Sequence, residues 1–209
     1  MRISIVAPHC DDETLGCGGL LFKLKKKKVP TSVIFISEHK SDKLDNILKK
    51  IKTKYNLKNI HRLGYEPSTL DICNKGILIE KIKKALIDFR TSDLYLPNPD
   101  DIHTDHYHTF RSSLSASKWF RNKYIKKIFI YETLSESEIL SSKAFTPNVF
   151  INIKNEIKDK IKTMKLYESE IKNFPFPRST TAINSLAKFR GSSCGFEYAE
   201  AFKLIFSKE

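Results

Sequence analysis

The chain has 209 residues, of which 40% are hydrophobic, and 37 Lys and Arg against 24 Asp and Glu give it a formal net charge of +13. This length and composition are enough for a full hydrophobic core, so we expect a single domain over residues 1–209. The apolar runs fall far short of the roughly 20 residues of a membrane-spanning helix, and the N-terminus lacks a signal-peptide pattern. We therefore expect a cytoplasmic protein without a transmembrane segment.

Apolar runs typical of strands alternate along the chain with segments of helical periodicity. Strands are predicted at residues 3–7, 32–36, 60–63, 93–96 and 127–131. Helices are predicted at residues 13–27, 43–55, 74–89, 106–120 and 155–170. This alternation is typical of βαβ units, so we predict an α/β fold with a mostly parallel twisted sheet and helices on its faces.

The positive charge leaves two interpretations open. Most lysines fall in runs on the polar faces of the predicted helices, which favours solvated surfaces, whereas clustered lysines also bind polyanions. We expect no nucleic-acid partner, since attraction of a small anionic substrate requires far less positive charge than a nucleic-acid groove.

Four cysteines, Cys10, Cys17, Cys73 and Cys194, include no pair at two-residue spacing. We expect free thiols rather than a metal or redox motif.

The first candidate motif directly follows the first predicted strand and contains His9, Cys10, Asp11, Asp12 and Glu13. An imidazole and a carboxylate three residues apart can bind one cation and leave Asp11 free as a general base. The alternative is that the acidic residues only stabilise a helix N-terminus. Three glycines follow in the predicted helix, but their spacing matches no phosphate-binding loop, so close packing of the helix on the sheet is favoured. These are Gly16, Gly18 and Gly19.

The second candidate motif, residues 101–106, follows the fourth predicted strand and supplies His103 and His106. Ligands of open parallel sheets bind outside the carboxyl ends of the strands, where both motifs fall. Hydrolytic zinc takes three protein ligands and leaves one position open, and His9, Asp12 and His106 provide such a set. The alternative for the segment around His103 is a polar loop. His39 and His61 are interpreted as structural, and His108 as a loop residue.

His103 is the candidate for stabilising the oxyanion of an amide substrate or for donating a proton. We expect Asp105 to hold the tautomer of this imidazole and keep it protonated, as carboxylates near metal sites often do. Asp101 is a further candidate for such a supporting role.

Together the two motifs resemble those of the PIG-L family, also called LmbE-like N-deacetylases. The resemblance continues through Tyr131-Glu132, residues 145–150, 167–170 and 176–179, Arg190-Gly191 and residues 199–202. It implies a Rossmann-like fold, zinc on His9, Asp12 and His106, Asp11 as general base, and His103 as acid or electrophilic partner. It also implies removal of the acetyl group from an N-acetylglucosamine-type unit.

Two departures from the family pattern concern the turn and the sugar site. Cys10 stands where the family usually has proline, so the turn loses a fixed φ and gains a thiol close to the metal. Pro67 occupies the position of an aspartate in a loop commonly linked to sugar binding. Glu66 or Asp71 is the candidate to replace that acid.

The sequence therefore predicts a metal-dependent hydrolase that deacetylates an N-acetylated amino sugar, with Zn²⁺ as the expected cofactor and Fe²⁺ as the alternative. Arg178 and Arg190 are candidates for binding an anionic part of the substrate, with ordinary salt bridges as the alternative. A hydrolase of another amide or a phosphoester remains open, as does a non-catalytic polyanion-binding protein. A homo-oligomer is also compatible with the sequence.

Overall fold

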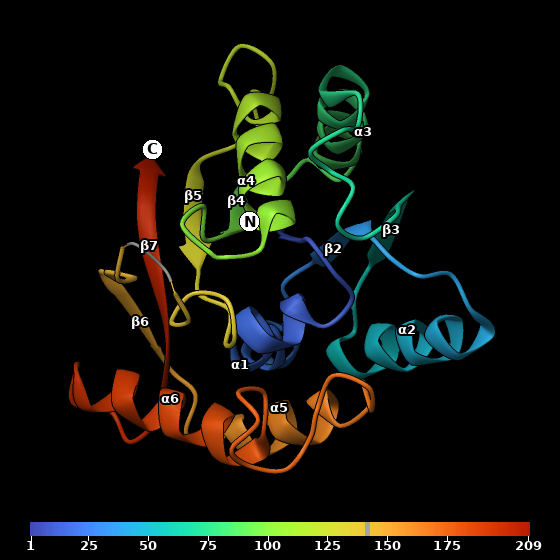
Figure 1. Ribbon diagram of the computed structural model, residues 1–209. Coiled ribbons are helices and arrows are strands. Elements are labelled where there is room, and N and C mark those ends of the chain that lie inside the picture. The colour runs from blue at the N-terminus through green and yellow to red at the C-terminus, as the bar shows by residue number, and fades with distance from the viewer. Residues whose placement is uncertain (141–142) are drawn as a thin grey trace.

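The computed structural model describes residues 1–140 and 143–209. In this part of the chain one sheet contains seven strands in the order β3-β2-β1-β4-β5-β7-β6. Strands β1 to β5 pair parallel to one another, β7 pairs antiparallel with β5, and β6 pairs antiparallel with β7 at the edge of the sheet (Figure 1). The strands are β1 (Ile3–Ala7), β2 (Thr31–Ser37), β3 (Asn59–Tyr65), β4 (Asp93–Pro97), β5 (Lys127–Tyr131), β6 (Val149–Asn152) and β7 (Ala199–Ser207).

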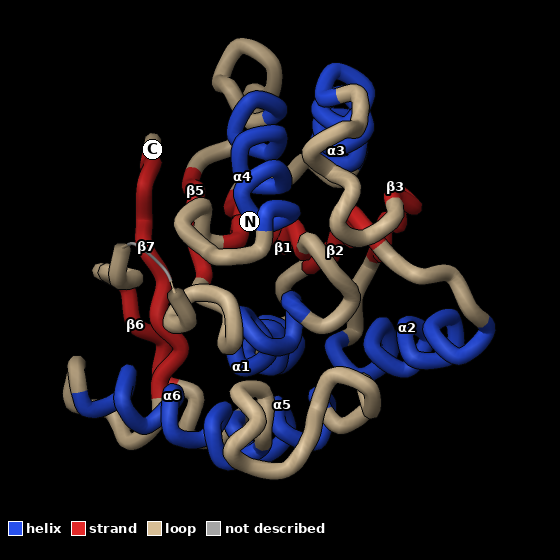
Figure 2. Tube along the Cα trace, in the orientation of Figure 1, coloured by secondary structure: helices blue, strands red, loops and turns tan. Residues whose placement is uncertain are grey.

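Helices cover both faces of the sheet (Figure 2). On one face lie α3 (Lys75–Asp88) and α4 (Thr104–Ala116). On the other lie α1 (Asp12–Lys26), α2 (Asp42–Tyr55), α5 (Ile157–Met164) and α6 (Thr180–Ser192). The predicted fold class, a mostly parallel twisted α/β sheet with helices on both faces, is confirmed.

The strand sequences explain why two cores form. Successive strand residues point to opposite faces, so Val33 and Phe35 of β2 join the core under α1 and α2. Their neighbours Ile34 and Ile36 join the core under α3 and α4. Strands buried on both faces read as continuous apolar runs, and that is the pattern on which β1, β2 and β4 were predicted.

The first helix lies close to the sheet because its glycines leave room. A Cβ atom at Gly16 would lie within 2.9 Å of three carbon atoms of the buried Tyr131 ring in β5. The Tyr131 hydroxyl donates to the carbonyl oxygen of Val6 at 2.8 Å, which fixes the ring across the sheet. The predicted close packing is thus found at Gly16, and a Cβ at Gly18 would instead meet α5 and α2 through Lys160 and Tyr55.

Some elements differ from the sequence-based expectation. The helix predicted at 106–120 begins at Thr104 and ends at Ala116, and the helix predicted at 155–170 covers only Ile157–Met164. Strands β6 and β7 and helix α6 were not predicted. None of the helices in the described residues combines the length and the apolar character that a bilayer crossing requires.

Candidate metal centre and active site

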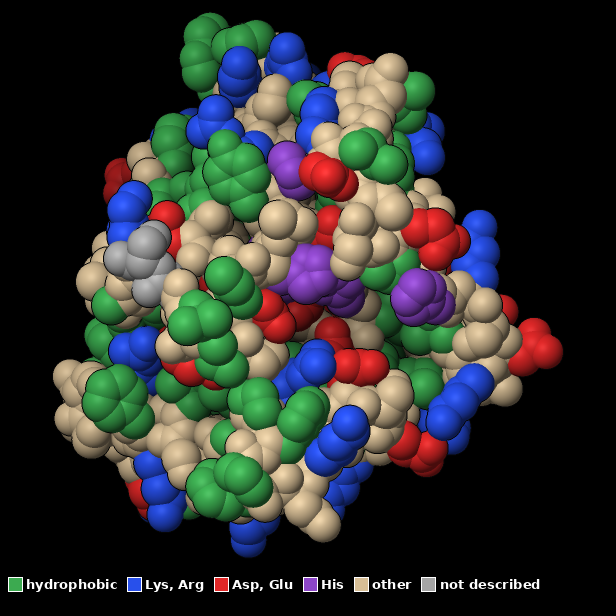
Figure 3. Space-filling view, in the orientation of Figure 1, with side chains coloured by type: hydrophobic (Ala, Val, Ile, Leu, Met, Phe, Trp, Pro, Cys, Tyr) green, Lys and Arg blue, Asp and Glu red, His purple; other side chains and the backbone are tan. Residues whose placement is uncertain are grey.

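Both sequence motifs lie where neighbouring parallel strands end. His9 to Asp12 follow β1, and residues 98 to 106 follow β4, which pairs directly with β1. Figure 3 shows histidine and acidic side chains gathered in a hollow on this face. The topology therefore brings together two segments that lie about ninety residues apart in sequence.

Three side chains at this point can hold one metal ion. His9 Nδ1 lies 3.3 Å from Asp12 Oδ2, and His106 Nε2 lies 3.4 Å from the same oxygen. All the ligand atoms that His9, Asp12 and His106 offer lie within 4.8 Å of one another. Two imidazole nitrogens and one carboxylate fit zinc that keeps an open position. The structure thus brings the predicted ligand set together.

Asp101 orients one of these histidines. Its Oδ2 atom accepts a hydrogen bond from His106 Nδ1 at 2.7 Å, and both side chains are buried. The carboxylate also accepts from Asn98 Nδ2 at 2.8 Å and from Ser137 Oγ at 2.5 Å. With its proton on Nδ1, His106 presents the lone pair of Nε2 toward Asp12. This is the arrangement in which carboxylates support metal-binding histidines.

The Asp105 carboxylate contacts His9 rather than His103, and it is the backbone N–H of Asp105 that holds the tautomer of His103. The Asp105 Oδ2 atom lies 3.1 Å from His9 Nε2 and accepts from the backbone N–H of Ser68 at 2.7 Å. Its Oδ1 atom accepts from the N–H of Leu70 at 3.3 Å. With its Nε2 proton directed to Asp105, His9 presents Nδ1 to Asp12.

His103 caps helix α4 and stands at the edge of the centre. Its Nδ1 atom accepts the backbone N–H of Asp105 at 3.1 Å, so the proton of the neutral ring lies on Nε2. Burial and then the positive charges of His9 and His106 lower its pKa, and the charges of Asp105 and Asp12 oppose this decrease, so the balance favours the neutral ring. The neutral ring offers an N–H donor. The centroids of the His103 and His9 rings lie 4.5 Å apart.

A second group of three, His9, His103 and Asp105, also has ligand atoms within 4.8 Å of one another. Its Asp105 oxygens are already engaged by two backbone N–H groups and by His9. The set with Asp12 and His106 is therefore the better candidate.

Charges in the metal-free site are strongly coupled. Burial alone would raise the pKa of Asp12, but the charge of His106 and hydrogen bonds from both histidines lower it well below its ordinary value. Burial opposes protonation of His9 and His106, yet their carboxylate partners raise the pKa of His9 to about 9 and that of His106 to about 10. This electrostatic field favours a positive charge among these three side chains, as a cation would supply.

Asp11 lies beside this set and is almost fully buried. Burial, followed by the negative charge of Asp12, raises the pKa of Asp11 to about 8. Arg178 opposes this rise: its Nη1 atom lies 3.1 Å from Asp11 Oδ2 and 3.1 Å from Glu170 Oε2. A buried carboxylate with a raised pKa, held by one guanidinium, has the character of a general base.

A cavity of about 500 Å³ opens onto the centre. It extends from the turn after β1 to the start of α2, so it can receive a ligand considerably larger than an acetyl group. Its lining includes all three candidate ligands, Asp11, His103 and Arg178, and further Cys10, Glu38, His39, Ser41, Lys43, Leu44, Ile47, Pro67, Glu136, Tyr167 and Glu168.

Two predicted substrate-binding residues do not line this cavity. Arg190 forms a bidentate ion pair with Glu132, in which Nε lies 2.8 Å from Oε1 and Nη2 lies 2.5 Å from Oε2. It contributes to a separate void of about 20 Å³, so the salt-bridge alternative is the correct one for Arg190. Glu66 is exposed and lies 3.4 Å from His39 Nδ1 at the rim, and it is the neighbouring Pro67 that lines the cavity.

Tyr167 was not identified from the sequence as a site residue. It lines the cavity, and its buried hydroxyl donates to Glu13 Oε1 at 2.9 Å. Burial raises the pKa of Glu13 to about 7, with the hydrogen bonds from Thr14 and Tyr167 acting in the opposite direction. The one feature of the sequence that pointed to this residue was the resemblance of residues 167–170 to the PIG-L family, and it does not show where the side chain points.

Cys10 is half-buried and lines the cavity, and burial raises the pKa of its thiol. Neither of the two candidate metal groups includes it.

Comparisons with solved structures show the same fold. A conserved protein from Thermus thermophilus has a TM-score of 0.81 and 20% identity, covering 99% of this chain and 96% of that one. The N,N'-diacetylchitobiose deacetylase from Pyrococcus horikoshii has a TM-score of 0.79 and 17% identity, covering 98% and 83%. GalB, the 4-carboxy-2-hydroxymuconate hydratase from Pseudomonas putida, has a TM-score of 0.77 and 11% identity, covering 100% and 97%.

A deacetylase and a hydratase thus share this fold, so the fold alone does not assign the reaction. No curated protein sequence matches the chain. Residues 4–117 match the family described as PIG-L: GlcNAc-PI de-N-acetylase. This match covers more than half of the 209 residues and contains both motifs. The chain belongs to the PIG-L family.

Proposed function

We propose that this protein is a zinc-dependent hydrolase that removes the acetyl group from an N-acetylated amino sugar. The observation that carries the proposal is the convergence of His9, Asp12 and His106 beside the buried Asp11 in one cavity. Membership of the PIG-L family supports the reaction type. The substrate class is a glycoconjugate or sugar precursor of the N-acetylglucosamine type, and Fe²⁺ is the alternative metal.

His9, Asp12 and His106 would hold the cation. When bound, a divalent cation lowers the pKa of a water molecule and polarises a carbonyl group, which makes hydrolysis of an amide possible near neutral pH. Asp11 takes the proton of the attacking water, because this buried carboxylate lines the same cavity, directly precedes the ligand Asp12 and is not itself among the ligands. Arg178 holds the Asp11 carboxylate in place.

His103 acts opposite Asp11. Its Nε2 proton donates a hydrogen bond to the developing oxyanion, since the Asp105 amide fixes the tautomer that carries this proton. Asp11 then passes the proton that it took from water to the leaving amine, which departs as the free amino sugar. Acetate is the second product, so one water is consumed for each bond broken.

The cavity lining supports a polar substrate with an apolar portion. Near the metal set it offers carboxylates, imidazoles and a guanidinium, whereas toward α2 it offers Leu44 and Ile47. A sugar ring presents hydroxyl groups together with an apolar C–H face, and both kinds of side chain suit it. The conjugated group would extend toward α2.

The test is acetate release from free, glycosidic and nucleotide-linked N-acetylglucosamine, with zinc-loaded and chelated protein measured in parallel. Zinc-dependent release from any of these compounds supports the proposal. The order of their rates shows which group attached to the amino sugar the enzyme prefers. Release of phosphate without acetate from phosphoester analogues would favour the phosphoesterase alternative. Unchanged polyanion binding after chelation, without hydrolysis of either class, would favour a non-catalytic binding protein.

A further inference from the structure

Residues 118–127, Lys-Trp-Phe-Arg-Asn-Lys-Tyr-Ile-Lys-Lys, run from the end of α4 to the first residue of β5, at the end of α4 remote from the cavity. Five of these ten residues are Lys or Arg, and none is Asp or Glu. Helix α4 starts beside His103 and has 13 residues, so this connection lies about 20 Å from the metal ligands at 1.5 Å per residue. In the structure Lys118, Lys123, Lys126 and Lys127 lie outside the helices.

Two large aromatic side chains stand on the surface of this connection. Trp119 is 71% exposed and Phe120 is 63% exposed. Their ring centroids are 5.7 Å apart and the ring planes are nearly perpendicular. In Figure 3 hydrophobic side chains next to Lys and Arg form the top of the molecule, where Figure 1 shows the loop that follows α4. Soluble proteins expose such adjacent aromatics chiefly at interaction sites.

The connection is held in a defined shape, so the exposure is built into the fold. The backbone N–H of the buried Asn122 donates to the Lys118 carbonyl at 2.9 Å, and Asn122 Oδ1 accepts from the N–H of Tyr124 at 3.1 Å. Ile125 is 1% exposed and belongs to the core under α3 and α4. Residues 118–121 therefore form a tip between two anchored ends.

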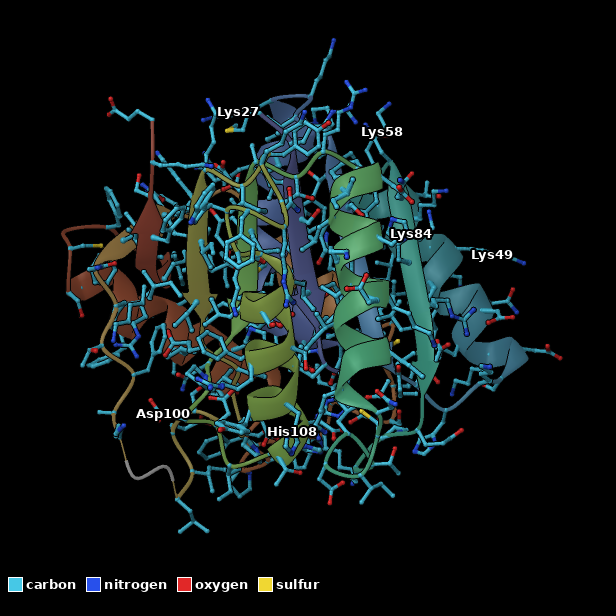
Figure 4. The ribbon with its side chains drawn as sticks, turned by 90° about the horizontal axis from the view of Figure 1, so that it is seen from above. Lys27, Lys49, Lys58, Lys84, Asp100 and His108 are labelled. Atoms are coloured by element: carbon cyan, nitrogen blue, oxygen red, sulfur yellow. The ribbon has the colours of Figure 1, made fainter. Side chains whose placement is uncertain are left out.

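Further basic residues lie near this tip, at the amino ends of the parallel strands. Lys126 donates its backbone N–H to the Ser92 carbonyl at 2.7 Å, Ser92 donates to Arg2, and Lys208 donates to Lys126 at 2.8 Å. The Arg90 guanidinium lies 6.0 Å from the centroid of the Tyr124 ring. Figure 4 shows Lys27 and Lys58 at this end of the molecule, away from Asp100 and His108.

Acidic side chains also lie at this end. Asp93 and Glu209 share a shallow depression with Lys126, Lys127 and Lys208. We define the basic aromatic surface by the exposed basic and aromatic residues of this end. It comprises Arg2, Arg90, Lys118, Trp119, Phe120, Arg121, Lys123, Lys126 and Lys127.

We propose that the basic aromatic surface docks on an anionic lipid bilayer, with Trp119 and Phe120 entering the headgroup region. Tryptophan and phenylalanine partition into the membrane interface, and Lys and Arg next to them are attracted by anionic headgroups. The cavity lies at the other end of α4. Docking therefore leaves it open to a substrate that reaches it from the aqueous side.

Two other occupants fit this surface less well. A second copy in a symmetric contact would bring the same lysines of two chains together without acidic partners. Single-stranded nucleic acid would stack its bases on open ring faces. Here the rings of Trp119 and Phe120 contact each other, and Lys118 Nζ lies 5.9 Å from the Phe120 centroid.

The experiment uses Trp119, which is the single tryptophan of the chain. Its emission is followed while the whole chain is titrated with phosphatidylcholine vesicles that contain or lack phosphatidylserine. We expect a blue shift and quenching by brominated acyl chains only with the anionic vesicles, and weakening as salt is added. No shift with anionic vesicles would overturn the proposal, as would a shift that RNA or a rise in protein concentration alone reproduces.

Charge variants separate a local surface from the net charge of the protein. The double change Lys123→Glu and Lys126→Glu should reduce vesicle partitioning by at least about 25-fold, since each neutralised charge alone accounts for about fivefold. The matched control, Lys49→Glu and Lys50→Glu on the exposed side of α2, alters the net charge equally and should change partitioning far less. Equal losses in the two variants would contradict a local docking surface.

A third variant tests the aromatic contribution. Trp119→Ser should weaken cosedimentation with anionic vesicles, whereas acetate release from a water-soluble substrate should stay unchanged because the residue lies remote from the cavity. Circular dichroism of each variant verifies folding. Unchanged cosedimentation would show that the rings do not enter the interface.

Discussion

His106 Nδ1 lies 2.7 Å from Asp101 Oδ2, and both side chains are buried at the base of the cavity. This hydrogen bond determines which imidazole nitrogen of His106 is available to a metal. Because Asp101 also accepts from Asn98 and Ser137, its position does not depend on the histidine alone. Residues outside the candidate ligand set therefore hold His106 in the orientation that a metal would require.

Asp101→Asn should weaken metal binding by about 10- to 100-fold, the range typical for loss of a carboxylate that orients a metal-binding histidine. The amide can accept from His106 but holds its proton less strongly. Competition with a zinc-sensitive chelating dye measures the affinity. The control Asp71→Asn removes one exposed carboxylate and should leave the affinity unchanged. Equal affinities for the Asp101 variant and the parent would contradict this role.

The sequence predicted the central strands and the two histidine motifs well because each depends on local pattern. Continuous apolar runs mark strands buried on both faces, and residues after adjacent parallel strands must lie close together. Strand β6 was missed because it is a short, partly buried edge strand, and β7 was missed because only its first four residues are buried and Glu200 and Lys203 interrupt its apolar run. Helix α6 was missed although Ser179 accepts from the N–H of Ala182, a capping signal that single residues carry weakly.

Side-chain direction is what the sequence could not supply at the site. The spacing placed His103, Asp105 and His106 on one turn, but it did not show that His103 caps the helix while the Asp105 carboxylate reaches His9. Nor could it distinguish Arg178, which enters the cavity, from Arg190, which pairs with Glu132 elsewhere. Such distinctions depend on the tertiary path of the chain.

Asp11→Asn should keep the metal and lose about 10²- to 10⁴-fold in turnover, the contribution of a positioned general base. The carboxamide preserves the shape of the side chain but cannot accept the proton of water. Metal content per chain and turnover number are measured on the same preparation. Near-normal turnover with metal retained would exclude Asp11 as the base.

Arg178→Gln should shift the acid limb of the pH–rate profile to higher pH. The positive charge of Arg178 lowers the pKa of Asp11, which burial and Asp12 raise, so removing the guanidinium raises that pKa further. A base with a higher pKa is ionised only at higher pH, and activity at neutral pH falls accordingly. Turnover measured across the acid and alkaline range on a saturating substrate gives the profile. A uniform loss without a shift would indicate that Arg178 binds the substrate instead.

The buried ion pair of Lys160 and Glu200 should contribute strongly to stability. Lys160 Nζ lies 2.7 Å from Glu200 Oε1, and these side chains are 7% and 4% exposed. Lys160→Met leaves an uncompensated buried carboxylate and should lower the free energy of unfolding by about 3–5 kcal/mol. Urea denaturation measures the change. The exposed pair of Lys84 and Asp88 provides the control, because Lys84→Met should cost far less.

Gly16→Ala tests how closely α1 lies on the sheet. The new Cβ would overlap the Tyr131 ring, which cannot retreat because its hydroxyl is bonded to the Val6 carbonyl. The helix must move instead, and overpacking of this kind costs about 1–3 kcal/mol. The control Gly76→Ala in α3 meets only Asn74 Oδ1, at 3.2 Å, and gains helix propensity. Because α1 begins at Asp12, a shifted helix should also weaken metal binding, which loss of stability elsewhere would not do. A Gly16→Ala variant with unchanged urea midpoint and unchanged zinc affinity would contradict the tight contact.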